Sequence, residues 1–420
     1  MFNNASLKNR SNTLFRWKAA AQCLFYFGIL ALIYFRDPRL LIQPRFWAEE
    51  GMGYFKSAYM LPAWQALIAP HQGYYSFWAN IAVELATLPP LRYAPLVTTL
   101  MSLVVVLWIF LAIHINDAPM VAEGSNKMTA TLAALMVGAT GEIWLNSINA
   151  QHYFVLLVFL ILIDSKTNGW KRKLWYSTAF VAGLSSIVAN LLTPLFFLRW
   201  WQTRARADLV LFGILACTAL LQATALLYSH FILGMAAYYV PAEQHRLTVG
   251  LPTVALLHKT LIYALDYPIS MPYKMYWPGM AAMLYLVYST RQSWNRYWPF
   301  LAAVPLIILP SLLASLNEVG GPRYVYASSV IVFLFILGVA TDSAIRKPAR
   351  LLAGLLLLAS LAGWGLRYRN DMHYYDQPSW PSWASQVQAW AHNPQAKLQA
   401  WPVLYPPQAM QVWAFTLPRK

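Results

Sequence analysis

Two adjacent carboxylates, Glu49 and Glu50, are the residues whose types and spacing most directly suggest chemistry. They lie in the segment Arg45-Phe46-Trp47-Ala48-Glu49-Glu50-Gly51, soon after the first apolar run of the sequence. Carboxylates beside Trp and Gly near an apolar boundary can have raised pKa values, so either one can serve as a general base or as a metal ligand. The same pair also fits two solvated acids at the start of an interfacial helix.

A second polar group lies between two apolar runs, in the segment from Glu142 to His152. Its side chains that suit sugar binding are Asn146, Asn149, Gln151 and His152. Amide side chains hydrogen-bond sugar hydroxyls well, and a histidine adds a proton-transfer or metal-binding role. The alternative is an ordinary turn between helices, because such turns are commonly polar.

A third feature is the turn Asn317-Glu318-Val319-Gly320-Gly321-Pro322-Arg323-Tyr324. It presents Arg323 and Tyr324 at an apolar boundary, where a guanidinium is well suited to bidentate capture of a phosphate. An arginine that only reaches from the apolar region to the interface is the alternative. Lys259 and Lys274 are further cations that can help to bind a phosphate, or can be ordinary interfacial residues.

His71 and Tyr74 form a smaller group, in the segment Pro70-His71-Gln72-Gly73-Tyr74. His71 can join the acids in contacting a polar substrate, and Tyr74 offers a ring and a hydroxyl. A histidine in a solvated loop would have the same local sequence.

The elements that must position these residues are membrane helices. Of the 420 residues, 59% are hydrophobic and only 11% are charged, so the chain cannot cover a water-facing surface. The net charge of +16 does not indicate nucleic acid here, because Lys and Arg gather in the cytoplasmic loops of membrane proteins. Cys23 and Cys217 each stand alone in an apolar run and predict no disulfide framework.

The apolar runs predict an all-α polytopic membrane protein with about nine to eleven transmembrane helices. With the basic N-terminus in the cytoplasm, the C-terminus is periplasmic. The expected spans are 19–35, 95–115, 128–145, 153–163, 209–229, 276–290, 298–316, 325–341 and 351–366. Residues 1–366 form the membrane domain, in which 36–94 is the first periplasmic loop and 230–275 is a periplasmic segment with interfacial helices. The Trp- and Pro-rich tail 367–420 is periplasmic.

The stretch 174–198 conflicts with a simple crossing, because Arg199, Arg204 and Arg206 follow it and should also be cytoplasmic. A re-entrant hairpin through 183–194 resolves the conflict, while a single span that violates the charge rule is the alternative. Most of the 15 acidic residues then lie outside or near the outer boundary, which favours work on that side of the membrane.

Together these segments resemble the integral-membrane GT-C glycosyltransferases, and in particular a bacterial group within them. The matching motifs cover most of the chain in order: Trp47-Ala48-Glu49-Glu50-Gly51, His71-Gln72-Gly73-Tyr74, Asn146-Ser147-Ile148-Asn149-Ala150-Gln151, Gly183-Leu184-Ser185-Ser186, and the Pro-rich end Pro406 through Trp413. The chain departs from the group in having Glu50 where an Asp is usual, and in lacking the expected proline at Ile187.

The resemblance implies a GT-C-like fold and inverting transfer of a sugar from a polyprenyl-phosphate donor. Carried over, Glu50 is the general base, while Glu49 orients the acceptor or, with Glu50, holds a divalent cation (Mg²⁺ or Mn²⁺) if one is used. Arg323 stabilises the departing phosphate with Tyr324 beside it. The group includes pilin arabinosyltransferases, so the resemblance points to arabinofuranose as the sugar and a pilin hydroxyl or a surface glycan as the acceptor. The active site would face the periplasm from the bacterial inner membrane, in contact with membrane lipids.

Two other classes of protein remain open. A transporter or a flippase for lipid-linked glycans would use the outer loops as a gate and needs ionisable residues at mid-membrane depth. A structural or assembly factor would use the Trp-rich tail as a docking surface.

Overall fold

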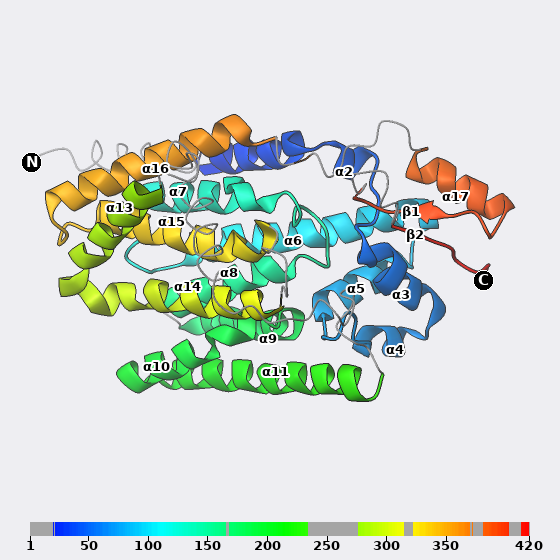
Figure 1. Ribbon diagram of the computed structural model, residues 1–420, viewed down its shortest axis with the longest axis horizontal. Coiled ribbons are helices and arrows are strands. Elements are labelled where there is room, and N and C mark those ends of the chain that lie inside the picture. Colours follow the sequence, from blue (N-terminus) through cyan, green and yellow to red (C-terminus); the bar gives the residue numbers. More distant parts are fainter. Residues whose placement is uncertain are drawn as a thin grey trace, which may run out of the picture.

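A computed structural model describes residues 20, 22–164, 168–233, 276–314, 322–369, 372, 381–402 and 413–419. Nearly all regular structure in these residues is helical. Most of the long helices lie roughly along the long axis of Figure 1 and form a bundle. Its loop-rich end carries residues 37–93, 137–150 and the tail. The opposite end carries the turns 116–123, 204–205 and 342–346, and we call it the basic end because Lys171, Arg199 and Arg204 lie there.

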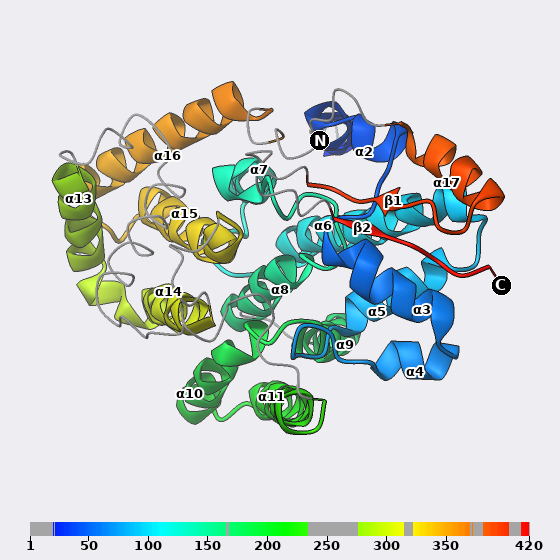
Figure 2. The ribbon, with the colours of Figure 1, turned by 45° about the vertical axis from the view of Figure 1, so that its right-hand side comes forward.

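Four helices of the described residues are long and apolar enough to cross a membrane. They contain α6 (Ala94–Ile115), α11 (Arg206–Phe231), α15 (Tyr326–Thr341) and α16 (Lys347–Arg367). The preceding 3-10 turns extend the first and third of these into the candidate spans Leu91–Ile115 and Arg323–Thr341. A span needs about 20 residues, and the chain is therefore a multi-pass membrane protein by length and composition. Helix α15 is buried along nearly its whole length, whereas α11 exposes leucines to the surroundings, so α15 lies inside the bundle and α11 at its edge (Figure 2).

Other helices complete the bundle. They are the helix Gln22–Arg36, α7 (Gly124–Met136), α8 (Gln151–Ile163), α9 (Gly169–Ser185), α10 (Thr193–Thr203), α13 (Tyr276–Ser289) and α14 (Trp294–Ala314). Each expected span has a helix at or near its position. The segment 230–275 falls outside the described residues from residue 234 onward.

The expected span 128–145 is wrong at its C-terminal end. Helix α7 stops at Met136, and the chain continues through a 3-10 turn at Gly138–Thr140. The amide groups of Asn146 and Asn149 donate to the Glu142 carbonyl at 2.8 and 2.9 Å and close a compact turn. Residues 137–150 are therefore irregular backbone at the loop-rich end.

The stretch 174–198 breaks between α9 and α10, at a 3-10 turn over Ala189–Leu192. Near the start of α9, Lys171 Nζ lies 2.7 Å from Asp164 Oδ2. Near the end of α10, Arg199 Nη2 donates to the Asp164 carbonyl at 2.6 Å. Because both cations meet Asp164, the start of α9 and the end of α10 lie at the same, basic end. The chain therefore turns back on itself between α9 and α10, as the expected hairpin would, and the position of this turn in a membrane stays a prediction.

The first loop folds into short helices that cover the loop-rich end. They are α2 (Arg39–Ile42), a π-helix at Glu50–Phe55, α3 (Lys56–Met60), α4 (Ala63–Ile68), α5 (Phe77–Ala86) and a 3-10 turn at Leu91–Tyr93 (Figure 1). Gly51 in the π-helix has no room for a side chain, because an added Cβ would lie 2.6 Å from Phe415 of the tail.

The tail packs on this loop. It contains α17 (Trp383–His392) and an antiparallel pair of short strands, β1 (Leu398–Gln399) and β2 (Ala414–Phe415). This two-residue pair is a small β element in a mostly helical fold. Trp401 N donates to the Phe46 carbonyl at 2.9 Å, and Trp47 and Trp401 form a β-bridge. The tail is thus attached to the backbone that precedes the acidic pair.

Candidate active site

Glu49 and Glu50 stand at the start of the π-helix, just after a strained residue. Ala48 has a φ of +40°, which is uncommon for a residue with a side chain. Its backbone N–H donates to the Trp401 carbonyl, so the tail holds this conformation. The two successive carboxylates after this turn have different environments: Glu50 is buried, and Glu49 is only partly buried.

Glu50 points into the protein, with 1% of its surface exposed. Its Oε1 accepts from Ser147 N at 2.8 Å and from Ser147 Oγ at 2.5 Å, and its Oε2 accepts from Trp47 N at 3.1 Å and from Thr98 Oγ1 at 3.2 Å. Burial raises the pKa of the Glu50 carboxyl, and these hydrogen bonds oppose the rise. Glu50 therefore joins the first loop to α6 and to the 137–150 turn, and its oxygens already have partners.

Glu49 is only partly buried, and its carboxylate lies within the electrostatic field of the Arg323 guanidinium. Burial raises the pKa of its carboxyl, while a hydrogen bond from its own backbone N–H to the carboxylate and the positive charge of Arg323 lower it. A carboxylate that is raised in pKa yet reachable has the properties of a general base. The geometry favours Glu49 for that role and does not support the preference for Glu50.

Arg323 lies opposite Glu142, with 3.6 Å between its Nη1 and Glu142 Oε2. Its Nη2 donates to the Tyr324 hydroxyl at 3.2 Å. The guanidinium also lies 4.9 Å from the centre of the Tyr324 ring, and 37% of the Arg323 side chain is exposed. Among the described residues this cation is only loosely paired, and it is accessible, so it is suited to receive an anionic ligand.

Tyr74, Gln151 and His152 belong to the same cluster. Gln151 Nε2 donates to the Tyr74 hydroxyl at 3.1 Å. The His152 ring meets the Tyr324 ring edge to face, with 5.8 Å between centres. Tyr74 also lies within the field of Glu49. The structure therefore brings these predicted residues to the acid and the arginine from separate segments of the chain.

The side chains of Asn146 and Asn149 make hydrogen bonds within the turn itself. Their amide nitrogens bind the Glu142 carbonyl, and Asn146 Oδ1 accepts from Asn149 N at 3.0 Å. These bonds shape the turn that carries Glu142 and Ser147, so the two side chains stabilise the backbone that positions those residues. Direct sugar contacts by these amide nitrogens are not supported.

His71 and Tyr74 close a two-residue turn of the type that needs left-handed backbone at both central positions. Gln72 and Gly73 have φ values of +53° and +85°. The His71 ring stacks against Tyr54 with 4.0 Å between ring centres. Burial lowers the pKa of His71 to about 4, so the ring is neutral at pH 7. His71 thus packs on Tyr54 and helps to close the turn that carries Tyr74, while its expected sugar or acceptor contact stays a prediction.

A metal role for the acidic pair, which the sequence left open, is not supported by the geometry of the pair. Among the described residues, no group of three or more His, Cys, Asp and Glu side chains is arranged to hold a metal ion. Glu50 has committed both oxygens to hydrogen bonds, so the pair does not offer two carboxylates to one cation. Lys259 and Lys274 lie outside the described residues.

Sequence reasoning did not assign roles to Ser147, Thr98 or Phe415. Ser147 lies inside the Asn-rich motif, and its proximity to the acids could have been suspected from that position. Thr98 in an apolar run and Phe415 in the tail carry no such signal. Their contacts with the acidic loop depend on the tertiary fold alone.

The sequence matches no protein-family model, and no curated protein matches it. The class of protein therefore follows from the long apolar helices, which define a multi-pass membrane protein. What the chain does must be argued from its polar cluster.

Proposed function

We propose that this protein is an inverting glycosyltransferase of the GT-C type, using a sugar donor linked to polyprenyl phosphate. The observation that carries the proposal is a reachable carboxylate, Glu49, within the field of an accessible guanidinium, Arg323, at one end of a helical membrane bundle. A base and a phosphate-binding cation are the two groups that such a transfer needs.

In the proposed reaction, Glu49 accepts the proton of the acceptor hydroxyl. The acceptor oxygen forms a bond to the anomeric carbon while the bond from that carbon to the phosphate oxygen breaks. The phosphate leaves with the bonding electron pair, and Arg323 stabilises its growing negative charge. Attack from the face opposite the leaving group inverts the anomeric configuration. No step requires a metal ion.

The loose contact between Arg323 and Glu142 supports this role. At 3.6 Å the Arg323–Glu142 distance is longer than that of a good charge-assisted hydrogen bond, about 2.7–2.9 Å. A phosphate can therefore bind the guanidinium without breaking a tight ion pair. Glu142 would then keep the arginine in place between turnovers. Tyr324 and His152 form an aromatic wall beside it, where a sugar face can stack.

The remaining details of the proposal come from the resemblance. They comprise arabinofuranose as the sugar, a pilin hydroxyl or surface glycan as the acceptor, and a periplasmic site in the bacterial inner membrane. Tyr74, Gln151 and His152 are the proposed sugar or acceptor contacts, because their polar groups face the same cluster.

Native mass spectrometry of the gently purified protein tests the donor class. We expect a co-purified polyprenyl phosphate carrying a sugar, which is lost in Arg323→Gln and retained in Arg92→Gln, a control at an arginine of the same end whose guanidinium lies over Tyr93. Only bulk phospholipid in wild type, across several mild detergents, would contradict the proposal.

A further inference from the structure

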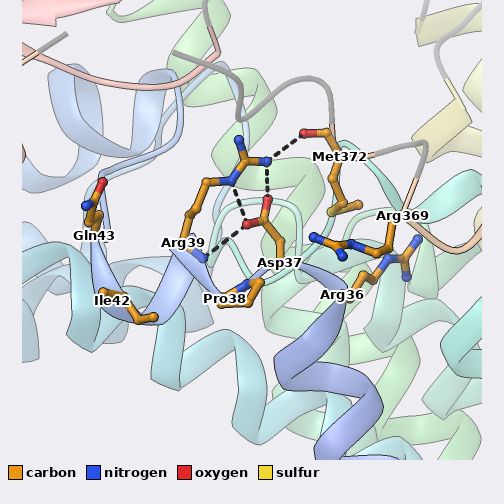
Figure 3. A pocket seen from close by; sticks show the side chains of 8 residues that line it. All are labelled: Arg36, Asp37, Pro38, Arg39, Ile42, Gln43, Arg369 and Met372. Carbon is orange, nitrogen blue, oxygen red and sulfur yellow. Dashed lines mark hydrogen bonds and ion pairs between the residues drawn. The ribbon is translucent and has the colours of Figure 1, made fainter. Parts of the chain in front are cut away.

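A second cationic site lies apart from the polar cluster. A pocket of about 700 Å³ is lined by three arginines, Arg36, Arg39 and Arg369, and by one acid, Asp37. Figure 3 shows these side chains among the residues that line it. Neither Glu49 nor Arg323 lines the pocket, so the pocket and the polar cluster are different sites.

The acid is already neutralised. Asp37 Oδ1 accepts from Arg39 Nε and Asp37 Oδ2 from Arg39 Nη2, both at 2.8 Å, and Arg39 Nη2 also reaches the Met372 carbonyl at 3.4 Å (Figure 3). This bidentate pair leaves Arg36 and Arg369 as the uncompensated charges of the pocket. Within the described residues, the Arg369 side chain makes no ion pair or hydrogen bond.

Arg36 is a buried cation with incomplete pairing. It is 1% exposed, and its guanidinium lies 4.3 and 4.7 Å from the ring centres of Trp144 and Tyr368. Its Nη1 donates to the Leu135 carbonyl at 3.0 Å, while Nε and Nη2 have no hydrogen-bond partner in the described structure. A buried charge without a carboxylate raises the positive potential of the pocket, which an anion would offset.

The surroundings indicate that the anion belongs to a lipid. Arg36 ends the helix Gln22–Arg36, and Arg369 follows the candidate span α16. Large apolar side chains near these two arginines are exposed, at 62% for Phe35, 64% for Ile42 and 86% for Leu366. Ile42 itself lines the pocket. A cationic pocket beside an exposed apolar face at the end of a membrane helix suits a headgroup with acyl or prenyl chains.

We propose that this pocket binds the phosphate of an anionic lipid headgroup, with the lipid chains lying against the exposed apolar face. Arg369 contacts the phosphate at the mouth of the pocket, Arg36 supplies charge from its buried side, and Arg39 stays paired with Asp37. Two sources share this chemistry, an anionic phospholipid and the polyprenyl phosphate carrier. The site is independent of the proposed transfer reaction.

The test measures lipid binding by native mass spectrometry in the Arg323→Gln protein, so that the candidate active site does not contribute. Phosphatidylglycerol, undecaprenyl phosphate and the zwitterionic phosphatidylcholine are titrated separately. We expect an anionic lipid to bind at least about tenfold more tightly than phosphatidylcholine, since charged hydrogen bonds contribute on this scale. Preference between the two anionic lipids identifies the source.

The variants make the assignment specific. Adding Arg369→Gln should weaken binding of the preferred anionic lipid about tenfold, and Arg369→Lys should weaken it less, because the charge remains. Arg367→Gln, two residues away and outside the pocket lining, is the matched control and should bind as the parent does. Equal binding of phosphatidylcholine and both anionic lipids, or no effect of Arg369→Gln, would overturn the proposal.

Discussion

The two neighbouring glutamates differ in role: Glu50 stabilises the loop, and Glu49 is the proposed base. Glu50 is enclosed and hydrogen-bonded through both oxygens, whereas Glu49 is partly exposed and within the field of Arg323. Sequence alone identified the pair but could not distinguish the two members. The distinction depends on the positive φ of Ala48 and on Ser147, which is far away in the sequence.

Replacing Glu49 tests its role as base. We expect Glu49→Gln to lower the transfer rate by about 10²–10⁴-fold, the usual contribution of a positioned base, without changing donor binding. Donor consumption and bound donor are measured on the same preparation. Wild-type turnover in this variant would remove Glu49 from the mechanism.

Replacing Glu50 should instead affect stability. Glu50→Gln brings an amide N–H₂ toward backbone and hydroxyl donors, which is expected to cost about 1–3 kcal/mol of unfolding free energy. The thermal midpoint in one fixed detergent reports the change, and Glu49→Gln is the control, expected to unfold near the wild-type temperature. An unchanged midpoint for Glu50→Gln would show that its hydrogen bonds do not hold the loop.

The acid side of the pH profile follows from the Glu49 pKa. A base must be ionised, so activity is complete above its pKa and falls as the pH drops through it. Burial raises this pKa and Arg323 lowers it. Removing the cation in Arg323→Gln should therefore move the acid limb of the residual activity to higher pH, while Arg92→Gln leaves it in place. A shift to lower pH would contradict the assignment.

At the scale of elements, the tail and the first loop act as one unit. The Trp47–Trp401 bridge and the contact of Gly51 with Phe415 place the tail in direct contact with the acidic loop. The sequence predicted a long outer loop and an outer tail, but contained no pattern that predicted their contact. Such pairings connect residues more than 300 positions apart and depend on the whole fold.

Gly51 tests this unit, with Gly53 as a matched control in the same helix. A Cβ at Gly51 would meet Phe415 at 2.6 Å, whereas one at Gly53 would meet nothing within 4 Å. Gly51→Ala should lower the thermal midpoint and the activity, at a cost of about 1–3 kcal/mol for overpacking, and Gly53→Ala should change neither.

The double variant Gly51→Ala/Phe415→Ala completes the cycle. It should be less destabilised than the sum of the two single changes, because removing the ring makes room for the new methyl group. Strictly additive effects on the thermal midpoint would mean that the tail does not press on this position.

At the scale of the whole molecule, hydropathy located the helices well because apolar length is encoded locally. The expected spans 95–115 and 351–366 correspond closely to α6 and α16. The end of α7 was misplaced, since the irregular 137–150 turn is still apolar in composition and is closed by Asn side chains. The break between α9 and α10 was inferred from charge, not from hydropathy.

Cysteine labelling tests the path of that break. In a background lacking Cys23 and Cys217, cysteines at Asn168 before α9 and at Thr203 in the last turn of α10 should both react from the cytoplasmic side. A cysteine at Gln388 in α17 should react from the outer side. Reaction of positions 168 and 203 from opposite sides would establish a simple crossing in place of a hairpin.

The central claim is that the cluster around Glu49 and Arg323 transfers sugar from a lipid phosphate. Its most direct measurement is release of free polyprenyl phosphate in nanodiscs, followed by mass spectrometry, for a panel of polyprenyl-phosphate sugars that includes arabinofuranose and with periplasmic extract as acceptor. We predict that wild type consumes at least one donor and that Glu49→Gln binds the same donor without consuming it. Absence of consumption by wild type across the panel, or equal consumption by Glu49→Gln, would contradict the account.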